Sequence, residues 1–250
     1  DGKYERQWRR KCLEPYITGY GQQPTFHFFG DQIWGSSHNK IAKFDRSGEL
    51  LDEQTFVDPA SLFIEKRDII LDDFHHICMK SERLEEGEKR RVVLEPLFKE
   101  KQGKTIVFAE EVRDWSIHKN MSAITNEWAT PNIWFAFCPE KKKLYTALST
   151  DYIITAYDLT ARPLYRIEIP HEPIKIGRRE KAVLIPWASK DKKEEWALEA
   201  FPDKLAAILS LHTLTGGYLA VLRITGPEEV AIDIFDSEGN YIHALEVPKG

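Results

Sequence analysis

Two adjacent histidines, His75 and His76, are the residues of this chain whose type first suggests metal binding. They open the apolar stretch His75–Met79, which has the composition of a β-strand, and consecutive side chains of a strand point to opposite faces of its sheet. Only one of the two imidazoles can therefore serve a given site, and a two-histidine centre needs a different spacing. The pattern favours a structural role for both histidines.

Aspartates near expected strand ends form a second group with possible metal chemistry, because carboxylates together with backbone carbonyls can bind calcium. Asp72 and Asp73 precede the His75–Met79 strand, where a polar turn is the favoured interpretation. Four more stand at other strand ends: Asp151, Asp158, Asp233 and Asp236. The sequence assigns none of them as a ligand. From the residues themselves we predict no metal and no cofactor, and we assign no catalytic residue.

A hydroxyl stands beside an imidazole in Gly35-Ser36-Ser37-His38. Neighbours in sequence are not a positioned nucleophile and base, so a loop between strands is the favoured interpretation. The chain contains no HExxH, GxSxG, P-loop or GxGxxG pattern. Trp34, Trp134 and Tyr145 are candidates for the rim of a ligand surface, but packing between sheets is favoured for them.

The three cysteines, Cys12, Cys78 and Cys138, form no CxxC or Cys/His cluster. Their odd number excludes a closed disulfide framework, and small buried thiols are favoured over one long-range disulfide.

Composition excludes several classes of function. The 250 residues are 42% hydrophobic and 30% charged, with a net charge of −5, so the chain has no bulk attraction for nucleic acid. No apolar run is long enough for a membrane-spanning helix. The first residues are polar and lack the pattern of a signal peptide, although a leader removed before this sequence begins stays open.

A strand–turn–strand sequence pattern recurs along the chain, and the strands that it predicts would position the residues named above. Phe44–Gly48 and Phe235–Gly239 share Phe-Asp-x-x-Gly, in which Asp suits the first and Gly the fourth position of a turn. Tyr157–Ala161 is a weaker copy with Ala161 in the glycine position, and looser copies end at Gly103 and at Gly2. The turn positions are near residues 2, 48, 103, 161 and 239.

Each clear copy follows two further short apolar segments, so the repeating unit is a meander of four antiparallel strands. Second strands are expected at Gln32–Gly35, His75–Met79, Lys143–Leu148 and Tyr218–Leu222, and inner strands at Thr25–Phe29, Ser61–Ile64, Asn132–Ala136 and Ala206–His212. One such sheet cannot bury both of its faces, whereas sheets stacked around an axis can. We therefore predict an all-β fold, a single β-propeller domain over residues 1–250 made of four-stranded antiparallel blades.

One short helical insertion is predicted at residues 190–200. Asp191 and Glu194 have the spacing of a helix N-terminus, and Pro202 ends the helix. Ala206–Leu211 fits either a helix or a strand, and its place in the repeat favours a strand.

The segments Gly30–Trp34 with Phe44–Gly48, Phe201–Val221 and Phe235–Ile242 resemble six-bladed β-propellers of the TolB-like and NHL-like group, and among them bacterial "6-bladed beta-propeller" proteins. The resemblance covers nearly the whole chain and implies six blades, either incomplete here or closed by the terminal strands. It also implies a periplasmic or extracellular location. Ala161 and residues 80–103 depart from the pattern.

We expect a non-enzymatic binding module that uses one propeller face, with a protein, peptide or glycan as its partner and no nucleic acid. The alternative is a metal-assisted hydrolase or lyase of the lactonase type, using calcium, which rests on fold analogy. The sequence specifies neither the ligand nor the oligomeric state.

Overall fold

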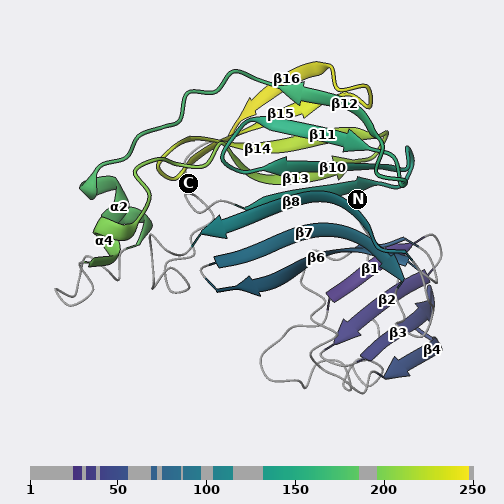
Figure 1. Ribbon diagram of the computed structural model, residues 1–250. Coiled ribbons are helices and arrows are strands. Elements are labelled where there is room, and N and C mark those ends of the chain that lie inside the picture. The colour runs from purple at the N-terminus through teal and green to yellow at the C-terminus, as the bar shows by residue number, and fades with distance from the viewer. Residues whose placement is uncertain are drawn as a thin grey trace. The chain divides into compact units, whose positions relative to one another are not determined.

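The computed structural model describes residues 25–29, 32–37, 40–55, 69–71, 75–85, 87–96, 104–114, 132–185 and 196–247. These residues form sixteen strands and two short helices. The strands make four sheets of four strands, and in each sheet the strands follow one another in chain order (Figure 1). Every strand pair with an assigned register is antiparallel. The all-β fold of four-stranded meanders is thereby confirmed.

The first two sheets contain the N-terminal half of the described chain. Their strands are β1 (Thr25–Phe29), β2 (Gln32–Ser37), β3 (Lys40–Asp45), β4 (Leu50–Thr55), β5 (Ile69–Ile70), β6 (His75–Leu84), β7 (Gly87–Pro96) and β8 (Ile106–Asp114). The first strand of the second sheet was expected at Ser61–Ile64, and this prediction is wrong. That strand is β5, because Ile69 and Ile70 pair with Ile77 and His76 across a short connection; residues 61–64 lie outside the described residues.

The third and fourth sheets follow the predicted pattern closely. Their strands are β9 (Ile133–Cys138), β10 (Lys143–Leu148), β11 (Ile153–Tyr157), β12 (Pro163–Glu168), β13 (Ile208–Leu214), β14 (Tyr218–Gly226), β15 (Glu229–Phe235) and β16 (Tyr241–Glu246). The ambiguous Ala206–Leu211 segment enters β13, so the strand prediction is confirmed.

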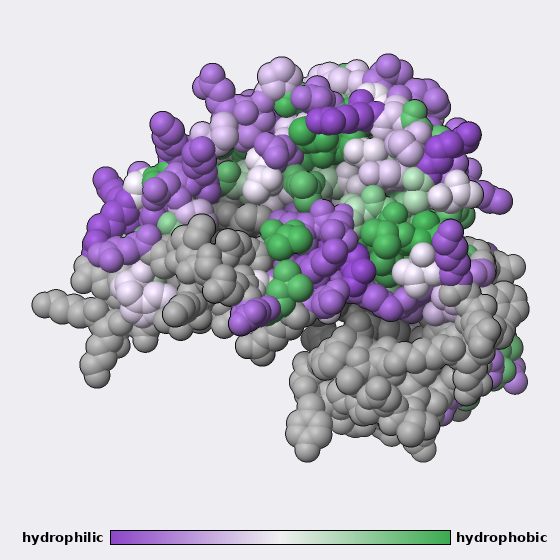
Figure 2. All heavy atoms as spheres, in the orientation of Figure 1, coloured by the Kyte–Doolittle hydropathy of each residue, from purple (hydrophilic) through white to green (hydrophobic). Residues whose placement is uncertain are grey.

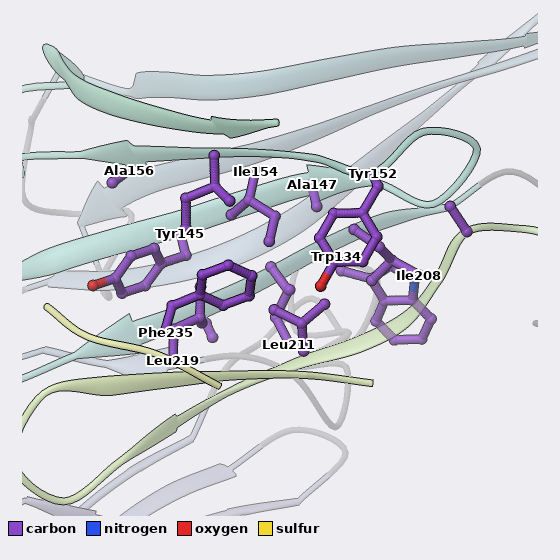
Figure 3. Packing of buried hydrophobic residues seen from close by; sticks show 14 of the residues in the cluster. Trp134, Tyr145, Ala147, Tyr152, Ile154, Ala156, Ile208, Leu211, Leu219 and Phe235 are labelled. Atoms are coloured by element: carbon purple, nitrogen blue, oxygen red, sulfur yellow. The ribbon is translucent and has the colours of Figure 1, made fainter. Parts of the chain in front are cut away.

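The third and fourth sheets pack face to face through a shared apolar core. Tyr145 and Trp134 of the third sheet meet Phe235, Leu219 and Leu211 of the fourth (Figure 3). Each large side chain buried in this way stabilises the fold by about 1.5–3 kcal/mol. Stacked four-stranded meanders of this kind are blades of a β-propeller.

Packing is also the role of the candidate rim aromatics. Trp34 is buried in the first sheet, and Trp134 and Tyr145 are buried in the third. The Lys43 ammonium lies 5.2 Å from the centre of the Trp34 ring. Packing between sheets is confirmed for Trp134 and Tyr145, which belong to the core shared by the third and fourth sheets, whereas Trp34 is shown to be buried.

The predicted turn repeat is present in three of the four sheets. Gly48 and Gly239 have φ near 87°, and Ala161 adopts the same left-handed conformation with φ 63°. In each turn, the preceding strand carries a bulge in its pairing with the fourth strand of its sheet. The turn positions near residues 2 and 103 lie outside the described residues.

A helix is present at the end of the predicted helical insertion, and the described residues before it contain a second helix that was not predicted. α4 (Trp196–Ala200) covers the end of the predicted helix, and residues 190–195 lie outside the described residues. α2 (Arg178–Leu184) was missed because it is only two turns long. Its local signal is Gly177-x-x-Glu180, since Gly177 N donates to Glu180 Oε2 (3.0 Å). Neither described helix is long and apolar enough to cross a membrane.

The chain divides into two compact units. The first comprises Asp1–Met79 with Leu94–Thr105, and the second comprises Lys80–Val93 with Ile106–Gly250. The third and fourth sheets and both helices belong to the second unit.

Candidate functional site

The connection between β12 and β13, residues 169–207, contains both described helices at one end of the third and fourth sheets, and we call it the insertion. Figure 1 shows α2 and α4 together at that end. Its two ends are held to the β10–β11 turn, since Ile169 N donates to Tyr152 O (3.1 Å) and Ala207 N donates to Ser149 O (2.6 Å). The insertion is therefore attached to the blades at a defined place.

The insertion has an apolar core of its own. The buried residues of this core are Ile176, Ile185, Ala197, Leu198, Phe201, Leu205, Ala206 and Ile224, the last contributed by β14. Two backbone bonds join its outgoing and returning segments, from Ile176 N to Asp203 O and from Leu205 N to Ile174 O (both 2.9 Å). This core holds the described parts of the insertion together.

A buried lysine, Lys181, also holds two parts of the insertion together. The Lys181 ammonium donates to Phe201 O and to Asp203 Oδ1, both at 2.6 Å. Hydrogen bonding and charge from Lys181 lower the pKa of the Asp203 carboxyl. Lys181 thus joins α2 to the segment that follows α4, and it is not available for a ligand.

Among its described residues, the insertion carries four exposed basic residues on its outside, which we call the basic patch: Lys175, Arg178, Arg179 and Lys204. Lys175 and Lys204 are paired across the β-bridge of the insertion, and the two arginines open α2. Figure 2 shows hydrophilic side chains over the region of α2. The patch carries a charge opposite in sign to the net charge of the chain, −5.

A buried hydrogen-bonded group lies beneath this end of the sheets. The Tyr152 hydroxyl donates to Asp233 Oδ2 (2.7 Å), and Arg223 Nε donates to the same oxygen (2.8 Å). Burial and the hydrogen bond to Asp233 raise the pKa of Tyr152, and the hydrogen bond to Asp233 raises the pKa of Arg223. The group connects the third sheet to the fourth, so Asp233 is a structural residue.

His171, at the start of the insertion, was not found by the sequence analysis. Burial lowers the pKa of its imidazole, and the nearby Arg223 guanidinium lowers it further. Within the described part of the chain no group hydrogen-bonds to its buried Nε2. Both effects favour the neutral form of the imidazole.

A second polar cluster lies in the sheet of β5–β8 and contains one of the two adjacent histidines. His76 Nε2 lies 3.3 Å from Glu95 Oε1, and Cys78 Sγ donates to the same oxygen at 3.6 Å. His75 is exposed while His76 is half-buried, so the two imidazoles are in different environments, as strand alternation predicts. Glu95 was missed, because it comes from β7 and only the pairing of β6 with β7 reveals it.

The other aspartates singled out in the sequence do not share one centre. Asp158 Oδ1 and Asp236 Oδ1 each accept backbone hydrogen bonds within their own turns. Asp151 accepts a bond from its neighbour Thr150. Asp233 is committed to Tyr152 and Arg223, so these four aspartates do not fit a calcium site together.

Further residues singled out earlier are placed only in part. Gly35, Ser36 and Ser37 belong to β2, so the loop expected for these three residues is wrong. Cys78 and Cys138 are buried and not in a disulfide, as favoured for them. His38, Asp72, Asp73 and Cys12 lie outside the described residues.

No protein-family model and no curated protein matches the sequence. Among solved structures, the chain is similar to the gluconolactonase XC5397 from Xanthomonas campestris, with 16% identity over 87% of this chain and 59% of that chain and a TM-score of 0.36. A DUF4221 family member from Bacteroides vulgatus has 8% identity over 93% and 70%, with a TM-score of 0.43. AztD from Citrobacter koseri has 10% identity over 90% and 47%, with a TM-score of 0.40. The chain spans less than two thirds of the gluconolactonase chain, and these similarities are too low to assign a function.

Proposed function

We propose that this protein is a non-enzymatic binding module, a single six-bladed β-propeller domain over residues 1–250, which holds its partner at the end that carries the insertion. The observation that supports this proposal is the separate core of the insertion. Two strands of neighbouring blades can be joined by a loop of about 4–6 residues. A longer connection with its own packed core is not needed to link the blades, and ordered surface elaborations on a rigid scaffold commonly carry binding.

The basic patch favours an acidic segment of a protein or peptide as the partner. Lys175, Arg178, Arg179 and Lys204 are exposed on the insertion, whose exposed acidic residues include Glu172 and Glu199. Asp203 and Glu180 are already bound to Lys181 and Gly177. Local positive charge on a chain of negative net charge attracts acidic partners selectively and speeds their association.

Binding of a fluorescent glutamate-rich peptide to the whole chain tests this proposal. The double variant Arg178→Glu with Arg179→Glu reverses two charges of the patch and is expected to weaken binding at least about tenfold, which is about 1.4 kcal/mol. Binding should also weaken as salt is raised, because the patch is exposed.

The matched control is Arg162→Glu with Arg166→Glu, which makes the same charge change at two exposed arginines next to and within β12. Equal loss of binding in the patch variant and this control would show that net charge alone matters. Such a result would contradict the proposed site.

A metal-assisted hydrolase or lyase of the lactonase type is the alternative. Its basis is fold analogy. The strand-end aspartates that could have held its calcium do not support it, because Asp158, Asp233 and Asp236 are committed to structural bonds. Calcium-dependent hydrolysis of a simple lactone by the chain would support the alternative over binding.

A further inference from the structure

We propose that His76, Cys78 and Glu95 form a zinc site in the sheet of β5–β8. The proposal is independent of the basic patch and of the binding function. One imidazole nitrogen, one sulfur and one carboxylate oxygen lie within 4.8 Å of one another. Nitrogen, sulfur and oxygen together are a donor set typical of Zn²⁺, whereas calcium takes oxygen ligands only.

Two of the three distances between the donor atoms agree with tetrahedral zinc, and the third, from the His76 nitrogen to Cys78 Sγ, is within 4.8 Å. With a Zn–S bond near 2.3 Å and Zn–N and Zn–O bonds of 2.0–2.2 Å, a tetrahedron separates N from O by about 3.4 Å and S from O by about 3.6 Å. The observed separations are 3.3 Å from His76 Nε2 to Glu95 Oε1 and 3.6 Å from Cys78 Sγ to Glu95 Oε1. These two separations fit the ion, and the His76 nitrogen and Cys78 Sγ must lie about 3.6 Å apart when the ion is bound.

The backbone explains why these three side chains meet. His76 and Cys78 are two residues apart on β6, so both project from the same face of the strand. Glu95 comes from the neighbouring strand β7, which keeps its carboxylate beside them. Donors held by paired strands lose little freedom when an ion binds, and this favours affinity.

The cluster is only partly buried, so an ion can reach it from solvent. Cys78 is buried at 5% exposure, while the side chains of His76 and Glu95 are 12% and 15% exposed. Three protein ligands leave one tetrahedral position for water or another small ligand. On binding, the Cys78 thiol loses its proton to solvent and the thiolate binds Zn²⁺, so one proton is released for each ion bound.

The competing interpretation is a purely hydrogen-bonded group in which the Cys78 thiol and the His76 imidazole donate to Glu95. Hydrogen bonds of this kind have nearly the same distances, so geometry alone does not separate the two cases. They differ in whether Zn²⁺ binds with a sulfur ligand.

Titration of the whole, chelator-treated chain with Co²⁺ and Zn²⁺ tests the proposal. We expect one ion per chain, a thiolate-to-cobalt charge-transfer band in the near ultraviolet, and loss of this band when Zn²⁺ displaces Co²⁺. Cys78→Ser and Glu95→Gln should each weaken Zn²⁺ binding at least about 10–100-fold, since even the loss of an outer hydrogen-bond partner costs that much.

Substitutions at two other residues of the chain serve as controls. His75→Gln removes the adjacent, exposed imidazole, and Cys138→Ala removes the other described thiol; neither should change affinity or the charge-transfer band. A band that survives Cys78→Ser, or one that disappears with Cys138→Ala, would place the metal elsewhere and overturn the proposal.

A measurement on the unaltered chain covers the case in which the variants fail to fold. Zinc X-ray absorption should show one sulfur at about 2.3 Å with nitrogen and oxygen ligands at about 2.0–2.2 Å. Absence of zinc binding, or bound zinc without a sulfur ligand, would overturn the proposal. Neither outcome affects the peptide-binding test of the basic patch, so the two proposals fail separately.

Discussion

At the scale of single residues, the last position of the repeated turn has a left-handed backbone, and in one of its three described copies this position is an alanine instead of a glycine. Gly48 and Gly239 occupy this position at no steric cost, whereas Ala161 holds φ 63° with a Cβ. For residues other than glycine, a left-handed backbone costs about 1–2 kcal/mol. At this turn position the third sheet therefore contains local strain that the first and fourth sheets avoid.

Ala161→Gly is expected to stabilise the protein by about 0.5–1 kcal/mol, because relief of the left-handed backbone exceeds the added flexibility of the unfolded chain. The free energy of urea unfolding measures this change. Ala182→Gly, within α2, provides the opposite case and should destabilise by about 1 kcal/mol. A loss of stability in Ala161→Gly would contradict the strain argument.

At the scale of elements, side-chain bonds fix how the fourth sheet lies on the third. Tyr165 OH and Lys143 Nζ both donate to Ser237 O, at 2.8 and 2.6 Å. Gly239, in the same turn, leaves room for Tyr165, since a Cβ there would lie 2.6 Å from the ring. At the other end, Tyr152 reaches Asp233. The blades are thus bonded at both ends of their apolar core.

Tyr152→Phe tests the bond at the insertion end. The change keeps the ring in the core but removes a donor from the buried Asp233 carboxylate, and we expect a loss of about 1–3 kcal/mol. Tyr218→Phe, at an exposed tyrosine of β14, should be nearly neutral. Equal effects of the two substitutions on the urea midpoint would show that the bond to Asp233 does not hold the sheets together.

At the scale of the whole molecule, three of the four sheets have the same aspartate-bonded turn between their third and fourth strands. The Oδ1 atoms of Asp45, Asp158 and Asp236 accept backbone hydrogen bonds from residues two and four positions later. The main causes of their lowered pKa values are hydrogen bonds from the side chains of Ser47, Thr160 and Asn240, respectively. The turn pattern that recurs in the sequence therefore corresponds to one recurring set of hydrogen bonds to an aspartate.

This arrangement predicts the response to acid. A carboxyl whose pKa is lowered by folding stabilises the native state above its unfolded pKa, here 3.8, and this contribution disappears as the pH falls through the lowered value. The triple variant Asp45→Asn, Asp158→Asn and Asp236→Asn should show a flatter decline of stability below pH 4, as measured by thermal unfolding. Glu140→Gln, in the exposed β9–β10 turn, serves as the control and should leave the decline unchanged.

The sequence by itself determined the local features of this protein. Strand alternation placed β1, β2, β9, β10, β13 and β14 to within a few residues, and Phe-Asp-x-x-Gly located the turns, because both signals depend on neighbours along the chain. Glu180 also provided a local signal for α2, but the helix is too short for a periodic pattern.

Only the tertiary structure decided which distant side chains meet. Glu95 joins Cys78 through the pairing of two strands, and Tyr152 reaches Asp233, 81 residues away, through the packing of two sheets. Strand register and sheet stacking are set by the summed burial of many apolar residues. For this reason the composition of neither cluster could be found from the spacing of its own members.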